Sequence, residues 1–201
     1  MRSLVQQMAR YRVFERLNAG RLMRDVRGLA AVEFAVILPV ALMLFIGMIS
    51  VSTGVAVNRK VIILTRTLSD LISQAQTITS VDLSNAFNIS AAVMAPYPSG
   101  PVQAKISQVY VDKDGVAKVK WGASSNATAR SCGDVVTSLV PPGIRIAGTY
   151  LIMSEVNYDY VPVVGMTGGA LTPPTFHLND RTFTRPRQTD SVSYPAAPPC
   201  T

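Results

Sequence analysis

The apolar pattern of the chain is dominated by an uncharged run of 24 residues, Phe34–Val57. At about 1.5 Å per residue, a helix of that length covers about 36 Å, which exceeds the hydrocarbon core of about 30 Å. A secretory signal peptide has a shorter apolar core followed by a small-residue cleavage site. The run therefore predicts a retained transmembrane helix.

Beyond this run, apolar residues recur at steps of three and four, which indicates a helix with one buried stripe. The stripe consists of Val61, Leu64, Leu68, Leu71 and Ala75. One continuous helix is therefore expected from about residue 29 to residue 76, and its outer half is amphipathic.

A second, shorter helix is predicted over residues 81–95. Thr79 or Ser80 can cap its N-terminus, and the proline-rich stretch 96–101 ends it. Its buried side is expected to carry Leu83, Phe87 and Met94.

From Val102 the apolar period changes to two, which is typical of strands. Residues 102–107 and 117–121 form a predicted hairpin around the turn Asp112–Gly115, with lysines on its outer face. Residues 123–146 are expected to be a loop. A strand over Tyr150–Tyr160 follows, and Pro162 means that it ends there or lies at an edge.

After a Gly/Thr/Pro-rich loop (Gly165–Thr175), a last strand is expected over Phe176–Thr184. The predicted fold class is α+β, pilin-like: a long N-terminal helix, a short second helix and a small antiparallel sheet of three to four strands. The expected divisions are a basic leader (1–28), a transmembrane helix (29–57), a helical region (58–95) and a β-rich domain (96–201).

Charge predicts the orientation of the span. Residues 1–27 hold seven arginines and two acids, whereas residues 61–201 hold ten basic and nine acidic residues. Basic residues beside a span stay cytoplasmic, although Arg59 and Lys60 on the other side weaken the bias. The expected location is a bacterial inner membrane, single pass, with the C-terminal domain in the periplasm. The near-neutral domain speaks against nucleic acid, and the leader is expected to contact membrane lipid.

The two cysteines, Cys132 and Cys200, both follow the span. In an oxidising compartment they can pair and hold the C-terminus, and the alternative is two unrelated thiols. They lie 68 positions apart in the sequence, which does not match the spacing of zinc ligands.

One acid, Glu33, stands at the start of the apolar segment. An intramembrane carboxylate is a functional candidate by default, and the alternative is that Glu33 stays wet at the cytoplasmic interface. The string from Gly28 to Pro39, GLAAVEFAVILP, is similar to the N-terminal signature of the TadE/TadG-like proteins of tight-adherence (Flp) pilus assembly. Weaker similarities follow at residues 69–74, 120–122 and 158–162.

This resemblance implies that a prepilin peptidase cuts between Gly28 and Leu29. It implies further that Glu33 neutralises the new amine on Leu29, within one subunit or between neighbours. Other implied partners are major and minor pilins and the inner-membrane assembly platform. Phe34 departs from the pattern, because tyrosine is frequent there in related pilins. Residence in the fibre and residence in the membrane both stay open.

Four further residues of the apolar run are candidates for helix shape and packing. Pro39 removes one helical hydrogen bond and is expected to kink or locally melt the helix, unless it is a tolerated membrane proline. Gly47, Ser50 and Gly54 lie on one face, which allows close approach of another helix.

No catalytic or metal-binding constellation is found in the sequence, so neither an enzyme nor a cofactor is predicted. The lone His177 is interpreted as structural, without an acidic partner nearby. The first hypothesis is a non-catalytic minor pseudopilin or assembly factor. The alternative is an uncleaved, signal-anchored periplasmic binding or scaffold module, in which Tyr150, Tyr158, Tyr160 and Trp121 line a site rather than form a core.

Overall fold

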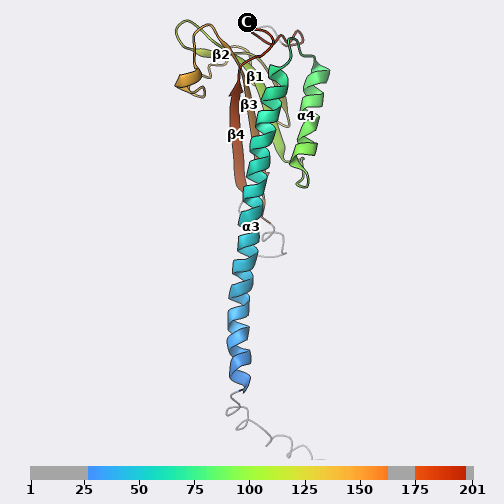
Figure 1. The fold of residues 1–201 in the computed structure, drawn as a ribbon, viewed down its shortest axis with the longest axis vertical. Helices are drawn as coiled ribbons and strands as arrows, with labels where there is room; N and C mark the ends of the chain where they lie inside the picture. Colours follow the sequence, from blue (N-terminus) through green and yellow to red (C-terminus); the bar gives the residue numbers. More distant parts are fainter. Residues whose placement is uncertain (1–26, 163–174, 198–201) are drawn as a thin grey trace, which may run out of the picture. The chain divides into compact units, whose positions relative to one another are not determined.

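A computed structural model of the chain describes residues 27–162 and 175–197 (Figure 1). Its longest element is helix α3, Arg27–Ser73, which has 47 residues. A single helix was predicted to run from the apolar segment into the amphipathic segment, and this prediction is confirmed. The leader up to residue 26, most of the predicted loop at 165–175 and Cys200 lie outside the described residues.

The chain divides into two compact units between Ile49 and Ser50. In the first unit the described residues form the apolar part of α3. The second unit contains the rest of α3, helix α4 (Ser80–Met94) and a four-stranded sheet. The architecture is therefore α+β, as the sequence predicted.

The sheet is antiparallel throughout, and its strand order is β2-β1-β3-β4. Its strands are β1 (Val102–Val111), β2 (Ala117–Ser125), β3 (Tyr150–Tyr160) and β4 (Phe176–Thr184). The β1–β2 turn is held by Asp112, whose Oδ1 accepts a hydrogen bond from the backbone N–H of Val116 at 2.8 Å. Gly115 adopts a φ of +75° in this turn, a conformation that suits glycine.

The main core lies between one face of the sheet and the two helices. The stripe predicted for α3 is correct at Val61, Leu64 and Leu68, which are all fully buried. It is wrong at the next position, because Leu71 is 40% exposed and Ile72 is buried instead. The helix turns about 100° per residue, so a step of four from Leu68 returns closer to the buried face than a step of three.

Helix α4 begins with a capping box. The Thr79 hydroxyl accepts a hydrogen bond from the backbone N–H of Asp82, and the Thr79 N–H donates to the Asp82 carboxylate. Two donors left unpaired by the helix geometry are thereby satisfied. Leu83 and Met94 are buried as predicted, and Phe87 is half-buried.

The region predicted as a loop at 123–146 is more ordered than expected. Strand β2 continues to Ser125, and a 3₁₀ turn covers Pro142–Ile144. Val136 and Val140 are buried in a second apolar cluster on the opposite face of the sheet. The sequence does not predict that this segment packs on the sheet, because its apolar residues are too sparse to show a period.

The segment after β4 closes the end of the core. The backbone N–H of Ile78 donates to the carbonyl of Ser193 at 2.9 Å, and Val192 is buried. Trp121 of β2 donates its indole N–H to the Val192 carbonyl at 2.9 Å. Trp121, Tyr158 and Tyr160 belong to the core, whereas Tyr150 is half-buried against Tyr110.

Candidate functional site: the apolar segment of helix α3 and its border

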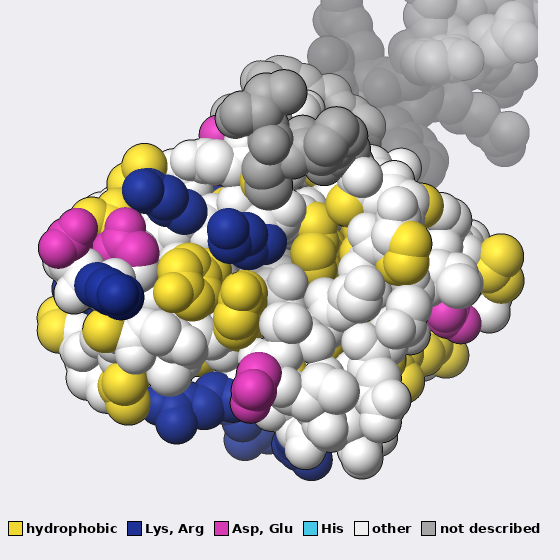
Figure 2. Space-filling model, turned by 90° about the horizontal axis from the view of Figure 1, so that it is seen from above, with side chains coloured by type: hydrophobic (Ala, Val, Ile, Leu, Met, Phe, Trp, Pro, Cys, Tyr) yellow, Lys and Arg dark blue, Asp and Glu magenta, His cyan; other side chains and the backbone are white. Residues whose placement is uncertain are grey.

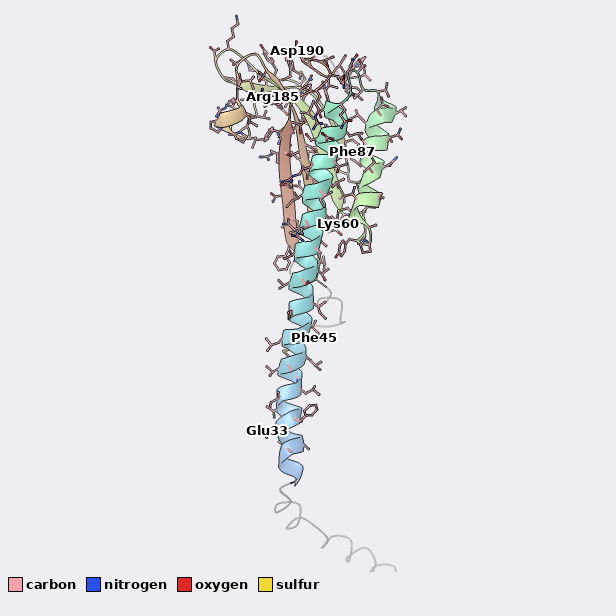
Figure 3. All side chains as sticks on the ribbon, viewed as in Figure 1. Glu33, Phe45, Lys60, Phe87, Arg185 and Asp190 are labelled. Carbon is pink, nitrogen blue, oxygen red and sulfur yellow. The ribbon has the colours of Figure 1, made fainter. Side chains whose placement is uncertain are left out.

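The apolar part of α3 presents its side chains to the surroundings on every side (Figure 3). The exposed large residues include Phe34, Ile37, Leu38, Leu42, Met43, Leu44, Phe45 and Met48. Within the described residues, one helix, the one that contains this segment, is long and apolar enough to cross a membrane. Water is a poor solvent for a helix that is apolar all round, so this segment suits a lipid or protein surrounding.

The predicted processing residues lie in the first turns of α3. Gly28 is exposed, and no atom lies within 4 Å of the place where a Cβ would stand. Leu29 and Glu33 are four residues apart in α3, which is about one helical turn. Glu33 and Phe34 are both exposed (Figure 3 labels Glu33).

Pro39 lies inside α3, and the helix continues through it without a break. Of the two predicted consequences, local melting is therefore not observed. A kink at this position stays a prediction.

The predicted packing residues separate into two groups. The place of a Cβ on Gly47 has no atom within 4 Å. Ser50 is buried, and its carbonyl accepts a hydrogen bond from the Tyr160 hydroxyl at 3.0 Å. A Cβ on Gly54 would stand 3.2 Å from Cε1 of the Tyr160 ring. Ser50 and Gly54 thus meet the end of β3, and packing of Gly47 on another helix stays a prediction.

Tyr160 belongs to a group of tyrosines beside α3. Burial is the main cause that raises the pKa of Tyr160, and the nearby Tyr97 adds to it. Burial also raises the pKa of Tyr158, whose hydroxyl donates to the Pro98 carbonyl at 3.1 Å. Lys60 of α3 donates from Nζ to the Ala95 carbonyl at 2.8 Å (Figure 3). The turn after α4 and the end of β3 therefore border α3 close to Arg59 and Lys60, the first charges after the apolar run.

An ion cluster on β3 was missed from the sequence. Both carboxylate oxygens of Glu155 accept from Arg130, at 2.7 and 2.9 Å, and Arg181 of β4 donates to Oε1 at 2.9 Å. Burial raises the pKa of Glu155, but the hydrogen bonds from the two arginines outweigh it and leave this pKa below its ordinary value of 4.5. The cluster fastens both the 126–149 loop and β4 to the central strand.

The interpretation of His177 as lacking an acidic partner is wrong. Its Nδ1 lies 2.6 Å from Oδ1 of Asp159, and the two residues are register partners on β4 and β3. Antiparallel pairing brings together residues that are 18 positions apart, which spacing along the sequence does not show.

The remaining candidates are the two cysteines, groups that could bind a metal ion, and a pocket beside α3. Cys132 is disulfide-bonded, but Cys200 lies outside the described residues, so the pair itself stays a prediction. Residues 27–162 and 175–197 contain no group of His, Cys, Asp and Glu side chains arranged to hold a metal ion. A pocket between α3 and α4 is lined mainly by apolar side chains, and its carboxylate, Asp82, is engaged by Thr79.

Comparison with known proteins adds one finding. Residues 28–63 match the family model described as TadE-like protein. The match covers the apolar segment and ends in the amphipathic part of α3, so the resemblance stated from the sequence is confirmed there. The match covers 36 of the 201 residues. No curated protein and no solved structure matches the chain.

Proposed function

We propose that this chain, TadE-like over residues 28–63, is a non-catalytic minor pseudopilin or assembly factor of a tight-adherence pilus. The observation that carries the proposal is the start of α3. A small residue, Gly28, precedes an acid, Glu33, and a long helical segment follows whose apolar side chains are exposed all round. Such a segment suits insertion into a bilayer and later into a bundle of pilin helices.

In this proposal the chain spans the bacterial inner membrane once. The arginine-rich leader lies in the cytoplasm and contacts anionic lipid, and the part of the chain that follows the transmembrane helix, residues 58–201, lies in the periplasm. The partners are the prepilin peptidase, the inner-membrane assembly platform, and major and minor pilins.

Processing occurs at the bond between Gly28 and Leu29. Hydrolysis consumes one water, leaves a carboxylate on Gly28 and leaves a protonated amine on Leu29. The open space around Gly28 supports this step, because a residue without a side chain lets the backbone approach a narrow protease site. The peptidase has to open the first turn of α3, which is the part of a helix that frays most easily.

Glu33 then compensates the new amine. A cation at a helix N-terminus is disfavoured by the helix dipole, whereas an acid there is favoured. The carboxylate lies one turn from Leu29, so it can pair with the amine of the same subunit or of a neighbour. In a low-dielectric surrounding an unpaired carboxylate is costly, so pairing between subunits fixes their axial register.

The test is complementation of a strain that lacks this gene, with surface pili counted by electron microscopy. Glu33→Gln keeps the size of the side chain but removes its charge, and we expect it to abolish most pili. The control Asp70→Asn removes a carboxylate from the other part of the same helix and is expected to leave pili intact. Normal piliation of the Glu33→Gln strain would overturn the role of this acid.

The alternative, an uncleaved periplasmic binding or scaffold module, makes a different prediction. In that case the strain that lacks the gene keeps its pili. Pili that persist in this strain would therefore overturn the assembly role as a whole.

A further inference from the structure

The second unit has an end at which α3 enters it, and this end differs in chemistry from the opposite one. Here β3 ends at Tyr160, β4 begins at Phe176, and α4 gives way to the turn at Ala95 (Figure 1). We call this end the rim and define it by six residues: Val55 and Lys60 of α3, Tyr97, Tyr160, Val161 and Phe176.

Large apolar side chains are exposed at the rim. Phe176 is 51% exposed, Val55 is 57% exposed and Val161 is 39% exposed. Phe176 is the register partner of Tyr160, and their ring centroids are 6.5 Å apart. The acid next to Tyr160, Asp159, contacts His177, so it does not stand as an isolated charge among the aromatic rings.

The opposite end of the unit, where α3 ends at Ser73 and α4 begins, has a different surface. Figure 2 shows it with Lys and Arg side chains, Asp and Glu side chains and hydrophobic ones intermixed. This mixture is typical of a surface in water. Leu71 and Val81 are exposed at that end too, so among the described residues of the second unit the feature particular to the rim is an exposed large aromatic ring, Phe176.

The length of the apolar run places the rim at a specific depth. A hydrocarbon core of about 30 Å takes about 20 helical residues. If the core begins between Ala30 and Phe34, it ends between Ile49 and Thr53. The first charges after the run Phe34–Val57 are Arg59 and Lys60. The residues between core and charges fall in the headgroup layer.

The rim contacts α3 in this headgroup stretch and at the charges that follow it. Tyr160 donates to the carbonyl of Ser50 and lies against Gly54, and Lys60 holds the turn at Ala95. Tyrosine and other aromatic side chains are enriched at the membrane–water interface, where the ring meets lipid and the hydroxyl meets polar groups. The Lys60 ammonium and the exposed Arg59 suit anionic headgroups.

From this juxtaposition we propose that the rim is a lipid-contacting surface and rests in the phospholipid headgroup layer. This rests on the proposed function, because it requires that α3 spans the bilayer. The domain then meets the membrane as a second point of attachment besides the helix, and the exposed Phe176, Val161 and Val55 are covered by lipid.

The experiment uses the full chain in vesicles of phosphatidylethanolamine and phosphatidylglycerol, with a small share of lipid spin-labelled at the headgroup or along the acyl chain. Three tryptophan variants are compared after subtraction of the native Trp121 signal: Phe45→Trp in the apolar segment, Phe176→Trp at the rim, and Val81→Trp at the opposite end. Val81 is 66% exposed, so it is a matched exposed site.

We expect acyl-chain labels to quench the Phe45→Trp variant and headgroup labels to quench the Phe176→Trp variant. The latter should also show emission at shorter wavelength than the Val81→Trp variant, which stays unquenched. If Phe45→Trp is quenched but Phe176→Trp behaves like Val81→Trp, the rim proposal is overturned and the span is retained. If Phe45→Trp is not quenched by any lipid label, the span and the rim are both overturned.

Discussion

Helix α3 consists of two parts that differ in what is buried. In residues 50–73, three polar side chains (Thr65, Ser69 and Ser73) are completely buried. In residues 30–49, large apolar side chains such as Phe34 and Phe45 are exposed. One part of the helix thus buries polar side chains together with apolar ones, whereas the other part leaves large apolar side chains exposed.

The buried polar groups are stable because their hydrogen bonds are made inside the domain. Thr65 donates to the carbonyl of Val61 at 2.8 Å, and the Ser69 hydroxyl donates to Oγ1 of Thr184 at 2.8 Å. The exposed apolar groups have no such compensation in water. Residues 50–73 of α3 therefore pack against the sheet, whereas residues 30–49 suit a surrounding less polar than water.

The largest expected effect separates a core position of α3 from an exposed one. Leu68→Ala removes a fully buried side chain and should lower the free energy of unfolding by about 2–5 kcal/mol, since a cavity remains. The control Leu71→Ala should cost clearly less because Leu71 is partly exposed, and Leu42→Ala should leave the domain unchanged. Denaturant unfolding of the full chain in detergent micelles, followed by the fluorescence of Trp121, measures all three. Equal losses for Leu68 and Leu71 would contradict the observed packing.

The second effect concerns the exposed part alone. Phe45→Arg places a charge near the middle of the apolar segment, at an expected cost of about 2.5–3.5 kcal/mol for insertion into the bilayer. The protein should shift from the membrane fraction to the soluble or degraded fraction. Phe45→Leu is the matched control and should stay in the membrane. Full membrane retention of the Phe45→Arg variant would mean that the segment does not lie in lipid.

The third effect concerns the contribution of the Glu155 ion cluster to the stability of the domain. Glu155→Ala leaves Arg130 and Arg181 without their shared carboxylate, and we expect a loss of about 2–3 kcal/mol. This is below the roughly 3–5 kcal/mol of a fully buried pair, since both guanidinium groups reach water. Unfolding in the same micelles measures it, with Asp190→Ala on the surface as the control.

The same cluster predicts a dependence of stability on pH. The pKa of Glu155 is lower in the folded chain than its ordinary value of 4.5, so its stabilising contribution is complete above about that pH. The contribution is lost as the pH falls through the lower folded pKa. Glu155→Gln should therefore remove a component of the acid-induced loss of stability. An unchanged acid profile in this variant would show that other carboxyls dominate.

The smallest expected effect compares the two glycines on either side of the boundary. Gly54→Leu places a side chain against the Tyr160 ring and should destabilise the domain by about 1–3 kcal/mol. Gly47→Leu adds the same side chain where no atom lies within 4 Å and should leave unfolding of the domain unchanged. Thermal unfolding monitored by near-ultraviolet circular dichroism distinguishes them. A loss for Gly47→Leu that matched the loss for Gly54→Leu would remove the distinction between the two parts.

Much of the fold could be predicted because it depends on local periodicity. The period of two predicted β3 at its observed bounds, Tyr150–Tyr160. The strand expected after the Gly/Thr/Pro-rich loop has the bounds observed for β4. The change in period after Asn58 predicted the amphipathic part of α3. The capping residues before α4 are a short-range signal, and Thr79 is the cap observed.

The parts that could not be predicted depend on contacts between distant residues. In the sequence, Glu155 is a polar residue of a strand that alternates polar and apolar positions. No residue near it in the sequence indicates that it pairs with Arg130 and Arg181. Gly54 was assigned to helix packing, whereas its partner, Tyr160, lies 106 positions later on β3. Such contacts form when strands pair and when a helix packs across a sheet. The local pattern of a single sequence does not predict them.

The most direct test of the central claim is the N-terminal residue of the protein extracted from membranes, determined by mass spectrometry. Strains with and without the prepilin peptidase are compared, and a Gly28→Leu variant serves as the matched block to cleavage. We predict a start at Leu29 only when both the peptidase and Gly28 are present. A leader that remains attached in every strain would contradict the account and make the chain a permanent anchor.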